Sequence, residues 1–341
     1  MYAIIRSILF SFDAEKVHNF TMWFISRMTF LYPLFRMLYN PGKTESVEIT
    51  GLKFRNKLGL AAGLDKNAVA VRAWEALGFS HVEVGTVTPL PQPGNDKPRI
   101  FRLKKDNALI NRLGFNNVGA EKLRENILSA RRKLSKDFII GVNIGKNKTT
   151  PLENAKDDYI KCMSLLFDIA DYFTINISSP NTEQLRELHK EEHLDELLVQ
   201  LMNLNRELAG KYAVAEKPIF LKIAPDLEKE GIEDVYRLAH KSGLTGIIAT
   251  NTTIARDGLT SGINESGGLS GQPLKTKADA VLKKLNELNL QNEKGKMVLI
   301  GVGGVFGRDD FDDKMRNGAG LVQIYTGFIY RGPGIIKKIL N

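Results

Sequence analysis

The sequence is poor in cysteine, since Cys162 is the only one among 341 residues. A lone thiol forms no disulfide within its chain and does not build a zinc or iron–sulfur site of several cysteines. The sequence therefore excludes a disulfide framework and predicts no metal site. It also favours a reducing compartment as the setting of the protein.

Long apolar runs are missing as well. A membrane-spanning helix needs about 18 or more apolar residues in succession. Charged residues interrupt every candidate stretch near the N-terminus; these are Arg6, Asp13, Lys16, Arg27 and Arg36. The first residues also lack the basic start and cleavage site of a secretory signal, and the Arg- and Ser-rich composition of a transit peptide. We therefore expect neither a signal peptide nor a membrane span.

The overall composition is that of a globular α/β protein, with 43% apolar and 26% charged residues and no segment of disordered or fibrous character. The length suits one large domain with a small appendage, or two ordinary domains. The net charge of +9 comes from basic residues scattered among nearly as many acids. This pattern indicates solubility and attraction to anionic surfaces, and it does not indicate a nucleic-acid partner.

Short β-rich apolar runs recur from Gly59 onward, separated by amphipathic stretches such as A-V-R-A-W-E-A-L-G. We expect strands at residues 58–64, 81–87, 138–144, 172–178, 218–224, 245–251, 297–303 and 321–327. Such runs are typical of parallel strands buried on both faces and connected by helices. Eight units of this kind predict an α/β fold, a (β/α)8 TIM barrel. A doubly wound open sheet is the alternative, but no strand is followed by its glycine-rich dinucleotide fingerprint.

Residues 1–45 stand apart from the predicted barrel domain, residues 46–341, and are dense in Phe, Met, Trp and Tyr. The stretch from Lys16 to Tyr39 predicts two short helices with wide apolar faces, broken near Pro33. Faces of this kind pack as a helical cap on a barrel, or they dip into a lipid surface when basic residues accompany them. The residues alone leave both interpretations open.

Polar residues follow most of the predicted strands, at the end of a TIM barrel where active sites lie. They are Lys66, Thr86, Asn143, Asn176, Ser179, Lys222, Thr250, Asn251, Thr252, Tyr325 and Thr326. A single Asn at a strand end is usually a turn residue. Three at equivalent ends, with Asn111 and Asn181 on nearby loops, match the alternating N–H and C=O groups of a flavin or a pyrimidine.

Two further features favour a charged ligand. Lys222 is a cation within a buried strand, and a buried cation needs an anionic partner. The partner is either a carboxylate of the protein, in a structural salt bridge, or a ligand such as a flavin, which gains negative charge on reduction. Glycine motifs end the last two strands, G-V-G-G at 301–304 and Y-T-G at 325–327. Backbone N–H groups at this place in a barrel often hold a phosphate, so both motifs together favour a phosphorylated cofactor such as FMN.

Six long motifs stand in a fixed order along the chain. They are A-A-G-L-D-K (61–66), E-V-G-T-V-T-P-L-P-Q-P-G-N-D-K-P-R (83–99), N-R-L-G-F-N-N (111–117), N-I-S-S-P-N-T (176–182), A-T-N-T-T (249–253) and G-G-L-S-G-Q-P-L (267–274). By these motifs the sequence resembles the class 2, quinone-dependent dihydroorotate dehydrogenases of bacteria over essentially its whole length. The resemblance implies oxidation of (S)-dihydroorotate to orotate in de novo pyrimidine (UMP) biosynthesis, with FMN as cofactor and a membrane quinone as acceptor. Whether that quinone is ubiquinone or menaquinone stays open.

The resemblance also implies roles for individual residues. It implies FMN contacts at Ala62, Gly63, Lys66, Thr86, Asn143, Asn176, Lys222, Thr250, Gly271, Gly304, Tyr325 and Thr326. It implies pyrimidine contacts at Lys66, Asn111, Arg112, Leu113, Gly114, Phe115, Asn176, Asn181, Asn251 and Thr252. Ser179 is the implied catalytic base, with a relay through water or a hydroxyl such as that of Thr182. His18, Arg102 and Tyr325 lie on the implied quinone route.

Two features favour class 2 of this family over class 1. Class 1 members use a cysteine on the loop where this chain has Ser179, and they lack an N-terminal appendage such as residues 1–45. In class 2 the appendage forms an apolar tunnel for the quinone. The resemblance therefore implies an enzyme bound peripherally to the cytoplasmic face of the bacterial cell membrane, in contact with lipid and without an obligate partner subunit.

Two alternatives remain at this point. A tRNA dihydrouridine synthase, another FMN barrel, would use the basic charge to hold RNA, but we find neither its active-site cysteine nor a helical domain after the last strand. A catalytically inactive barrel could serve as a membrane-bound scaffold. The intact set of Lys66, Asn176, Ser179, Asn181 and Lys222 disfavours that alternative.

Overall fold

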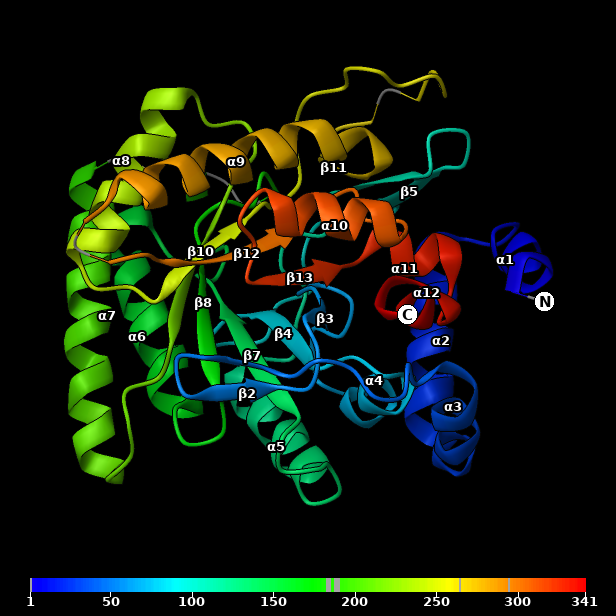
Figure 1. Cartoon of the computed structure of the whole chain (residues 1–341), viewed down its shortest axis with the longest axis horizontal. Helices are drawn as coiled ribbons and strands as arrows, with labels where there is room; N and C mark the ends of the chain where they lie inside the picture. Colours follow the sequence, from blue (N-terminus) through cyan, green and yellow to red (C-terminus); the bar gives the residue numbers. More distant parts are fainter. Residues whose placement is uncertain (1, 182–184, 187–190, 264, 294) are drawn as a thin grey trace.

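Eight parallel strands close into a barrel in the computed structural model of the protein (Figure 1). The structure describes residues 2–181, 185–186, 191–263, 265–293 and 295–341. In chain order the barrel strands are β3 (Leu58–Leu60), β4 (His81–Val87), β7 (Ile139–Ile144), β8 (Tyr172–Asn176), β9 (Ile219–Ile223), β10 (Gly246–Ala249), β12 (Val298–Val302) and β13 (Leu321–Ile324). The predicted (β/α)8 barrel is confirmed, and each predicted strand coincides with one of these.

The first and last barrel strands are shorter than predicted. β3 ends at Leu60 because the chain turns over the end of the barrel at Gly63, whose φ of +100° does not occur in a β-strand. β13 ends at Ile324, and helix α11 (Thr326–Arg331) begins two residues later. Both loops therefore bring polar backbone to the carboxyl ends of the strands.

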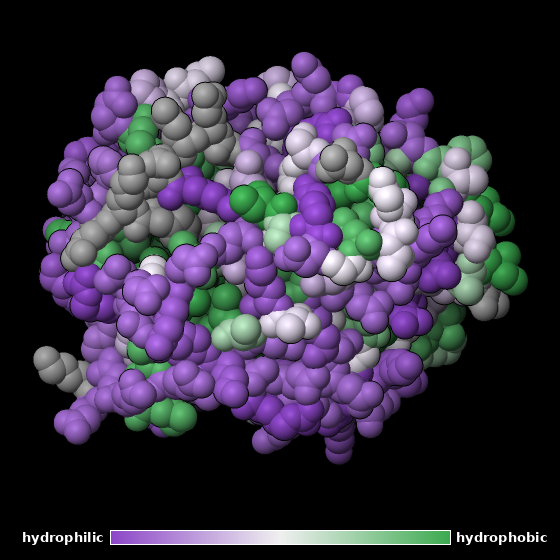
Figure 2. Space-filling model, turned by 90° about the horizontal axis from the view of Figure 1, so that it is seen from above, coloured by the Kyte–Doolittle hydropathy of each residue, from purple (hydrophilic) through white to green (hydrophobic). Residues whose placement is uncertain are grey.

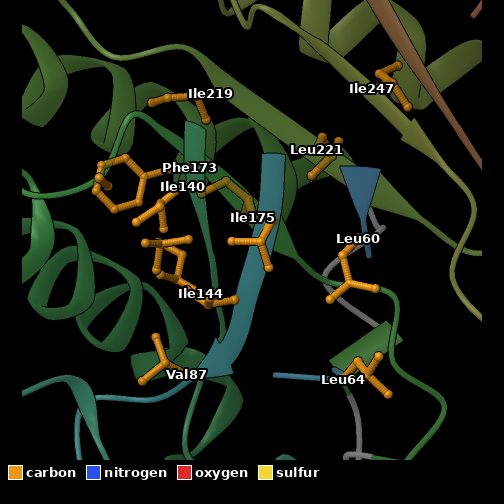
Figure 3. Close-up of a cluster of buried hydrophobic side chains, with 14 of the residues drawn as sticks. Leu60, Leu64, Val87, Ile140, Ile144, Phe173, Ile175, Ile219, Leu221 and Ile247 are labelled. Carbon is orange, nitrogen blue, oxygen red and sulfur yellow. The ribbon is translucent and has the colours of Figure 1, made fainter. Parts of the chain in front are cut away.

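Alternation along each strand divides its side chains between the barrel interior and an outer layer under the helices. On β8, Tyr172 belongs to the interior cluster, whereas Phe173 and Ile175 belong to the outer core, part of which Figure 3 shows. Gly141 of β7 leaves room for the interior residue of β8, because a Cβ there would lie 1.9 Å from the Tyr172 ring.

The interior residues change in character along the barrel axis. The amino ends of the strands contribute an apolar layer that includes Ile139, Tyr172, Phe220, Ile248, Ile300 and Leu321. Nearer the carboxyl ends the buried interior residues are polar: Glu83, Asn143, Thr174, Asn176, Lys222 and Gln323. A polar layer in a closed barrel requires partners for every group, and this layer forms the floor of the site described below.

Helices surround the barrel (Figure 1). They are α4 (Val71–Leu77), α5 (Ala120–Arg131), α6 (Ala155–Leu166), α7 (Glu191–Tyr212), α8 (Lys229–Lys241), α9 (Lys275–Gln291), α10 (Arg308–Arg316), α11 and α12 (Gly334–Leu340), with 3-10 turns η2 (Leu152–Asn154) and η4 (Gln272–Leu274) before α6 and α9. Buried residues of α6, such as Tyr159, Cys162 and Leu166, recur every three or four residues. Cys162 is therefore a packing residue, as its sequence context predicts.

Two small antiparallel sheets cover the ends of the barrel. The hairpin of β1 (Val47–Ile49) and β2 (Leu52–Phe54) lies at the amino ends, where Ile49 and Phe54 pack against the apolar interior layer. The second sheet consists of β5 (Ile100–Leu103), β6 (Ala108–Asn111) and β11 (Gly268–Gly271). Its residues Asn111, Ser270 and Gly271 line the cavity at the carboxyl ends.

The N-terminal segment forms α1 (Tyr2–Leu9), α2 (Ala14–Arg27), a 3-10 turn η1 (Thr29–Leu31) and α3 (Tyr32–Tyr39). These helices gather beside α11 and α12 on one side of the barrel (Figure 1). The predicted break falls just before Pro33, which occupies the first turn of α3, where a proline forfeits no intrahelical hydrogen bond. Helix α1 is an addition that the sequence pattern did not reveal.

Specific side chains tie these helices to the barrel. The Tyr2 hydroxyl donates to the Ile329 carbonyl at 2.6 Å and Arg6 donates to the Tyr330 carbonyl at 2.8 Å, which holds α1 against α11. Glu15 of α2 accepts two hydrogen bonds from Arg99, at 2.7 and 3.1 Å. Within the described part of the chain, no helix combines the length and the apolar character that crossing a membrane requires.

Large apolar side chains remain exposed on the N-terminal helices: Ile4, Ile5, Ile8, Phe12, Phe20, Trp23, Phe30, Leu34, Met37 and Leu38. In Figure 2, apolar surface gathers at the edge of the molecule where Figure 1 places α1. Exposed apolar surface of this extent marks an interaction site.

Candidate active site

A cavity lies at the carboxyl ends of the barrel strands, and we call it the main cavity. Most of the residues singled out from the sequence line it. These are Ala62, Gly63, Lys66, Thr86, Asn111, Leu113, Gly114, Phe115, Asn176, Ser179, Asn181, Lys222, Thr250, Asn251, Thr252, Gly271, Gly304, Tyr325 and Thr326. The fold therefore brings residues from almost the whole barrel sequence to one place.

The side-chain amides of the main cavity are joined by hydrogen bonds. Asn176 Nδ2 donates to Thr86 Oγ1 at 2.9 Å, and Asn251 Nδ2 donates to Asn176 Oδ1 at 3.2 Å. On the neighbouring loops, Asn181 Nδ2 donates to Asn111 Oδ1 at 3.2 Å. Each amide is thus held in one orientation by its neighbours, which gives the cavity a fixed pattern of donors and acceptors.

Lys222 and Gln323 line the main cavity above a buried carboxylate. Lys222 Nζ lies 3.4 Å from Glu83 Oε1, and Gln323 Nε2 donates to Glu83 Oε2 at 3.1 Å. The buried Gln323 Oε1 has no hydrogen-bond partner among the described residues. A buried acceptor in a cavity wall calls for a donor, and a ligand N–H would provide one.

Lys66 is the second cation of the main cavity. Its Nζ donates to Asn116 Oδ1 at 2.5 Å. Burial, followed by repulsion from Arg99, lowers the pKa of Lys66 to about 7, although the Glu15 carboxylate acts in the opposite direction. A ligand carboxylate beside this amine would therefore favour its charged form.

Ser179 lies on the loop after β8 and is nearly buried in the wall of the main cavity. Its hydroxyl oxygen accepts a hydrogen bond from the Asn181 backbone N–H at 3.3 Å. Arg186 joins this loop to the barrel, because its Nε donates to the Ser178 carbonyl at 3.3 Å and its Nη1 pairs with Asp226 at 3.1 Å. Thr182, named as a relay partner, lies outside the described residues.

The loops after β12 and β13 contribute backbone to the main cavity through Gly303, Gly304, Val305, Thr326 and Gly327. Gly304 has a φ of +76°, and a Cβ there would lie 2.4 Å from Lys275 Cβ. Only glycine brings the loop this close to the start of α9. Backbone N–H groups without intervening side chains suit an anion, as the glycine motifs predict.

A second cavity, of about 820 Å³, is lined by residues of α2, the loop after β3 and α5, and we call it the access cavity. Gly63, Lys66, Leu113 and Tyr325 line both cavities and form the wall between them. His18 also lines the access cavity. Burial, followed by the Lys66 charge, lowers the pKa of His18 to about 4, so its imidazole is neutral at neutral pH.

Three of the residues named from the sequence line neither cavity. Asn143 is buried beneath the main cavity, where its Oδ1 accepts a hydrogen bond from Thr86 Oγ1 at 2.5 Å. Arg112 pairs with Glu265 at 2.6 Å. Arg102 lies over the Phe10 ring, 4.5 Å from its centroid, and donates to the Phe12 carbonyl at 2.7 Å.

Sequence reasoning missed several polar residues of the cavity walls, among them Gln323 and Ser270 in the main cavity and Asn116 in the access cavity. Gln323 stands two residues after Leu321 on β13, so strand alternation identifies it as an interior residue. Asn116 lies within the motif N-R-L-G-F-N-N, but only its contact with Lys66 gives it a part in the site. Ser270 likewise lies within a motif, G-G-L-S-G-Q-P-L, but the motif does not single it out from its neighbours.

Comparison with known proteins identifies the family. Residues 45–341 match the family model for dihydroorotate dehydrogenase. A protein of Dechloromonas aromatica (strain RCB) named dihydroorotate dehydrogenase (quinone) is 46% identical over 344 residues, which cover 99% of this chain and 96% of that protein. This chain belongs to the dihydroorotate dehydrogenase family. A family member of the same name from Idiomarina loihiensis is 45% identical and covers 100% of this chain and 99% of its own length.

Solved structures of dihydroorotate dehydrogenases share the architecture. The enzyme of Eimeria tenella in complex with ferulenol superimposes with a TM-score of 0.88 at 37% identity, over 96% of this chain and 89% of its own. Its ligand-free form gives a TM-score of 0.84 at 38% identity, over 94% and 91%. The resemblance stated from the motifs is thereby confirmed, including the relation to the quinone-dependent enzymes.

Dihydroorotate dehydrogenases are in general flavin-dependent, and the residues of the main cavity fit a flavin. The unpartnered acceptor Gln323 Oε1 and the cation Lys222 suit a ring edge on which N–H and C=O groups alternate. The glycine loops around Gly304 and Gly327 suit a phosphate.

Proposed function

We propose that this protein oxidises (S)-dihydroorotate to orotate with FMN as cofactor and passes the electrons to a membrane quinone, as a step of de novo pyrimidine biosynthesis. The observation that carries the proposal is the convergence of Ser179, Lys66 and the cavity amides in one site of a chain from this family. Relatives named dihydroorotate dehydrogenase (quinone) support the choice of acceptor.

Lys66 and the cavity amides are the proposed substrate contacts. The Lys66 ammonium pairs with the carboxylate of dihydroorotate. Asn111, Asn176, Asn181, Asn251 and Thr252 present donors and acceptors to the N–H and C=O groups of the pyrimidine ring. The loop from Leu113 to Phe115 closes the same side of the cavity. These contacts orient the ring and exclude water from it.

Residues at the floor and at the glycine loops are the proposed FMN contacts. Thr86, Thr250, Lys222 and Gln323 hold the ring system, and the loops at Gly304 and Tyr325–Thr326 hold the phosphate. The bound flavin supplies the acceptor for the hydride that leaves C6 of dihydroorotate. Lys222 places positive charge where negative charge develops during the reaction.

Ser179 is the proposed base that takes the proton from C5 of dihydroorotate. A serine hydroxyl is a weak base, so it has to pass its own proton onward through water or a neighbouring hydroxyl. Because Ser179 is nearly buried, the proton leaves by such a relay and not directly into bulk solvent. Thr182 remains the candidate partner named from the sequence.

The access cavity is the proposed quinone site. A quinone there lies against the wall of Gly63, Lys66, Leu113 and Tyr325, on the other side of which is the main cavity. His18 is neutral and suits a hydrogen bond with a quinone carbonyl. Arg102, which was named for the same route, is proposed instead to hold α1, because it contacts the chain at Phe10 and Phe12.

Residues 1–45 are proposed to form a quinone-access unit and residues 46–341 the catalytic unit. The exposed apolar side chains of α1, α2 and α3 support peripheral contact with lipid. We place this contact at the cytoplasmic face of a bacterial cell membrane. No partner subunit is needed for the proposed half-reactions.

Rapid-mixing flavin spectroscopy tests the proposed function. Anaerobic dihydroorotate is expected to bleach the oxidised flavin band of the purified protein, and orotate is the expected product. Reoxidation is then followed with a panel of ubiquinones, menaquinones, fumarate and NAD, of which only the quinones are expected to react quickly. A protein that binds no flavin, or whose flavin dihydroorotate does not reduce, contradicts the proposal.

A further inference from the structure

Glu83 lies on β4 in the polar layer of the barrel interior, and its side chain is fully buried. Side chains of four other strands donate to its carboxylate. Oε1 accepts from Asn143 Nδ2 at 2.8 Å and Lys222 Nζ at 3.4 Å, and Oε2 accepts from Thr174 Oγ1 at 3.1 Å, Gln323 Nε2 at 3.1 Å and Tyr172 Oη at 3.4 Å. A carboxylate with this many donors is held in one position.

Glu83 does not line the main cavity, but its partners connect it to the cavity wall. Lys222 and Gln323 are wall residues. Asn143 in turn accepts a hydrogen bond from the wall residue Thr86 at 2.5 Å. A change in the charge of Glu83 would therefore act on the main cavity through groups that touch any ligand in it.

The carboxylate and the lysine beneath the cavity form a pair of opposite charges. Burial by itself raises the pKa of Glu83, but the Lys222 charge and the hydrogen bonds from Gln323, Asn143 and Thr174 outweigh it and hold the pKa below its usual value. Glu83 is therefore ionised at neutral pH, and the floor carries one negative and one positive charge.

The other titratable groups around this pair are neutral at neutral pH, with one exception. Burial lowers the pKa of His81 to about 4, raises that of Tyr172 well above its ordinary value, and raises that of Tyr325 to about 12. The exception is Lys66 in the wall of the main cavity, whose pKa is about 7. Apart from Lys66, the charged groups that act on the floor are therefore Glu83 and Lys222.

We propose that Glu83 is a positioning residue that fixes the Lys222 ammonium beneath the main cavity and balances its charge, and that this ion pair sets the reduction equilibrium of the bound flavin. The inference rests on the proposed function, because it takes the main cavity as a flavin site. Reduction adds negative charge above the pair. Removal of the Glu83 charge leaves Lys222 as an uncompensated cation, which favours the reduced flavin.

The midpoint potential of the bound flavin, measured against reference dyes without substrate, tests the proposal. Glu83→Gln keeps the size of the side chain and removes its negative charge. We expect the equilibrium to shift at least tenfold towards the reduced flavin, which is a rise of about 30 mV for a two-electron couple.

Glu75→Gln is the matched control. Glu75 is also buried and pairs with Arg55 at 3.0 Å, but it lies on α4 outside the barrel. The control is expected to lower the thermal stability and to leave the potential unchanged. If Glu83→Gln does not fold, Lys222→Met is compared with Lys222→Met/Glu83→Gln, which contains neither buried charge. Lys222→Met leaves the carboxylate as an unpaired charge in the floor, which disfavours the reduced flavin, so its potential is expected to lie below that of the double variant.

Two results overturn the proposal. One is an unchanged potential at every pH in a Glu83→Gln protein that retains its flavin. The other is an equal potential in the two Lys222→Met proteins, which would mean that the charge of Glu83 does not influence the flavin. Failure of the proposed function is seen separately, in the parent protein, as absent flavin or as flavin that dihydroorotate does not reduce.

Discussion

At the residue scale, the chemistry of the main cavity depends on polar side chains at the interior positions of successive strands. Asn176 and Lys222 are paired in the register of β8 and β9, so an amide and an ammonium stand side by side at the floor. Thr86 and Asn143 occupy the neighbouring strands and are joined at 2.5 Å. The strands thus hold these groups rigidly, and the loop after β8 adds the hydroxyl of Ser179 to the cavity wall.

Ser179→Ala is expected to slow the reduction of the flavin by dihydroorotate by about 10²- to 10⁴-fold, the usual contribution of a positioned base. Orotate binding is expected to change little, because Lys66 and the amides remain. Stopped-flow absorbance measures the rate, and titration with orotate measures the affinity. Ser164→Ala, which removes a hydroxyl of α6 outside both cavities, serves as control. An unchanged rate in Ser179→Ala removes Ser179 from the base role.

Orotate is expected to bind more weakly as the pH rises above about 7, the pKa of Lys66. The ammonium is the form that pairs with the ligand carboxylate, which is itself ionised throughout this range. Above its pKa the free amine must first take up a proton, so the affinity falls by up to about tenfold per pH unit. Titrations of the flavin spectrum measure this slope. Lys66→Met is expected to abolish it, and a flat profile in the parent protein contradicts the assignment.

A residue of the site could be predicted where a strand or a motif determines which way its side chain points. It could not be predicted where an ion pair with a distant part of the chain determines this. Asn176 and Lys222 belong to the first kind, because alternation on a buried strand leaves them only the barrel interior. Arg112 belongs to the second, because its pairing with Glu265 turns it away from the cavity. The sequence does not indicate which carboxylate pairs with an arginine when the two residues are more than a hundred positions apart in the chain.

At the scale of elements, α2 links the N-terminal segment to the cavities. One face of this helix supplies Glu15, His18 and Met22 to the access cavity, and the residues three and four apart share that face. The Glu15–Arg99 pair fixes the helix beside β5, which Arg99 directly precedes. The amphipathic pattern predicts the helix. Its position on the barrel depends on a buried ion pair between residues 84 positions apart, which the pattern does not reveal.

Deletion of residues 1–40 is expected to spare the reduction of the flavin by dihydroorotate, because every residue that lines the main cavity follows this segment. Reoxidation by a long-chain quinone is expected to fall at least about tenfold, since the wall of the access cavity from α2 is lost. The two half-reactions are measured separately by rapid mixing. A small soluble oxidant is the control and should react at the parent rate. If the truncated and full-length proteins turn over the long-chain quinone equally fast, the segment serves only in packing.

At the scale of the whole molecule, the barrel could be predicted because parallel strands buried on both faces give continuous apolar runs. The sheet of β5, β6 and β11 could not, because its strands come from two loops more than 150 residues apart and pair only in the folded protein (Figure 1). Register between such distant segments leaves no local pattern. The same holds for α1, whose anchoring to α11 joins the two ends of the chain.

The distribution of charge around the access cavity leads to a prediction about lipid. Arg27, Arg132 and Lys133 line this cavity and are exposed, and no ion pair of theirs is found within the described part of the chain. Large apolar side chains are exposed nearby: Trp23 of α2 lines the same cavity, and Phe30 of η1 follows the cavity residue Thr29. Cations beside an apolar surface favour a bilayer that contains anionic lipid.

Replacement of Arg27, Arg132 and Lys133 by Gln is expected to weaken binding to vesicles that contain phosphatidylglycerol by about a hundredfold, at about fivefold for each cation near an anionic surface. Vesicle flotation measures the binding, and vesicles of phosphatidylcholine alone should show little difference between the proteins. Replacement of Lys161, Lys229 and Lys283 by Gln is the matched control, because these exposed lysines lie on α6, α8 and α9, away from the N-terminal helices (Figure 1). If both triple variants lose affinity equally, the attraction to the vesicles comes from the net charge of +9 as a whole. The charges would then give no support to the proposed orientation of the N-terminal helices towards lipid.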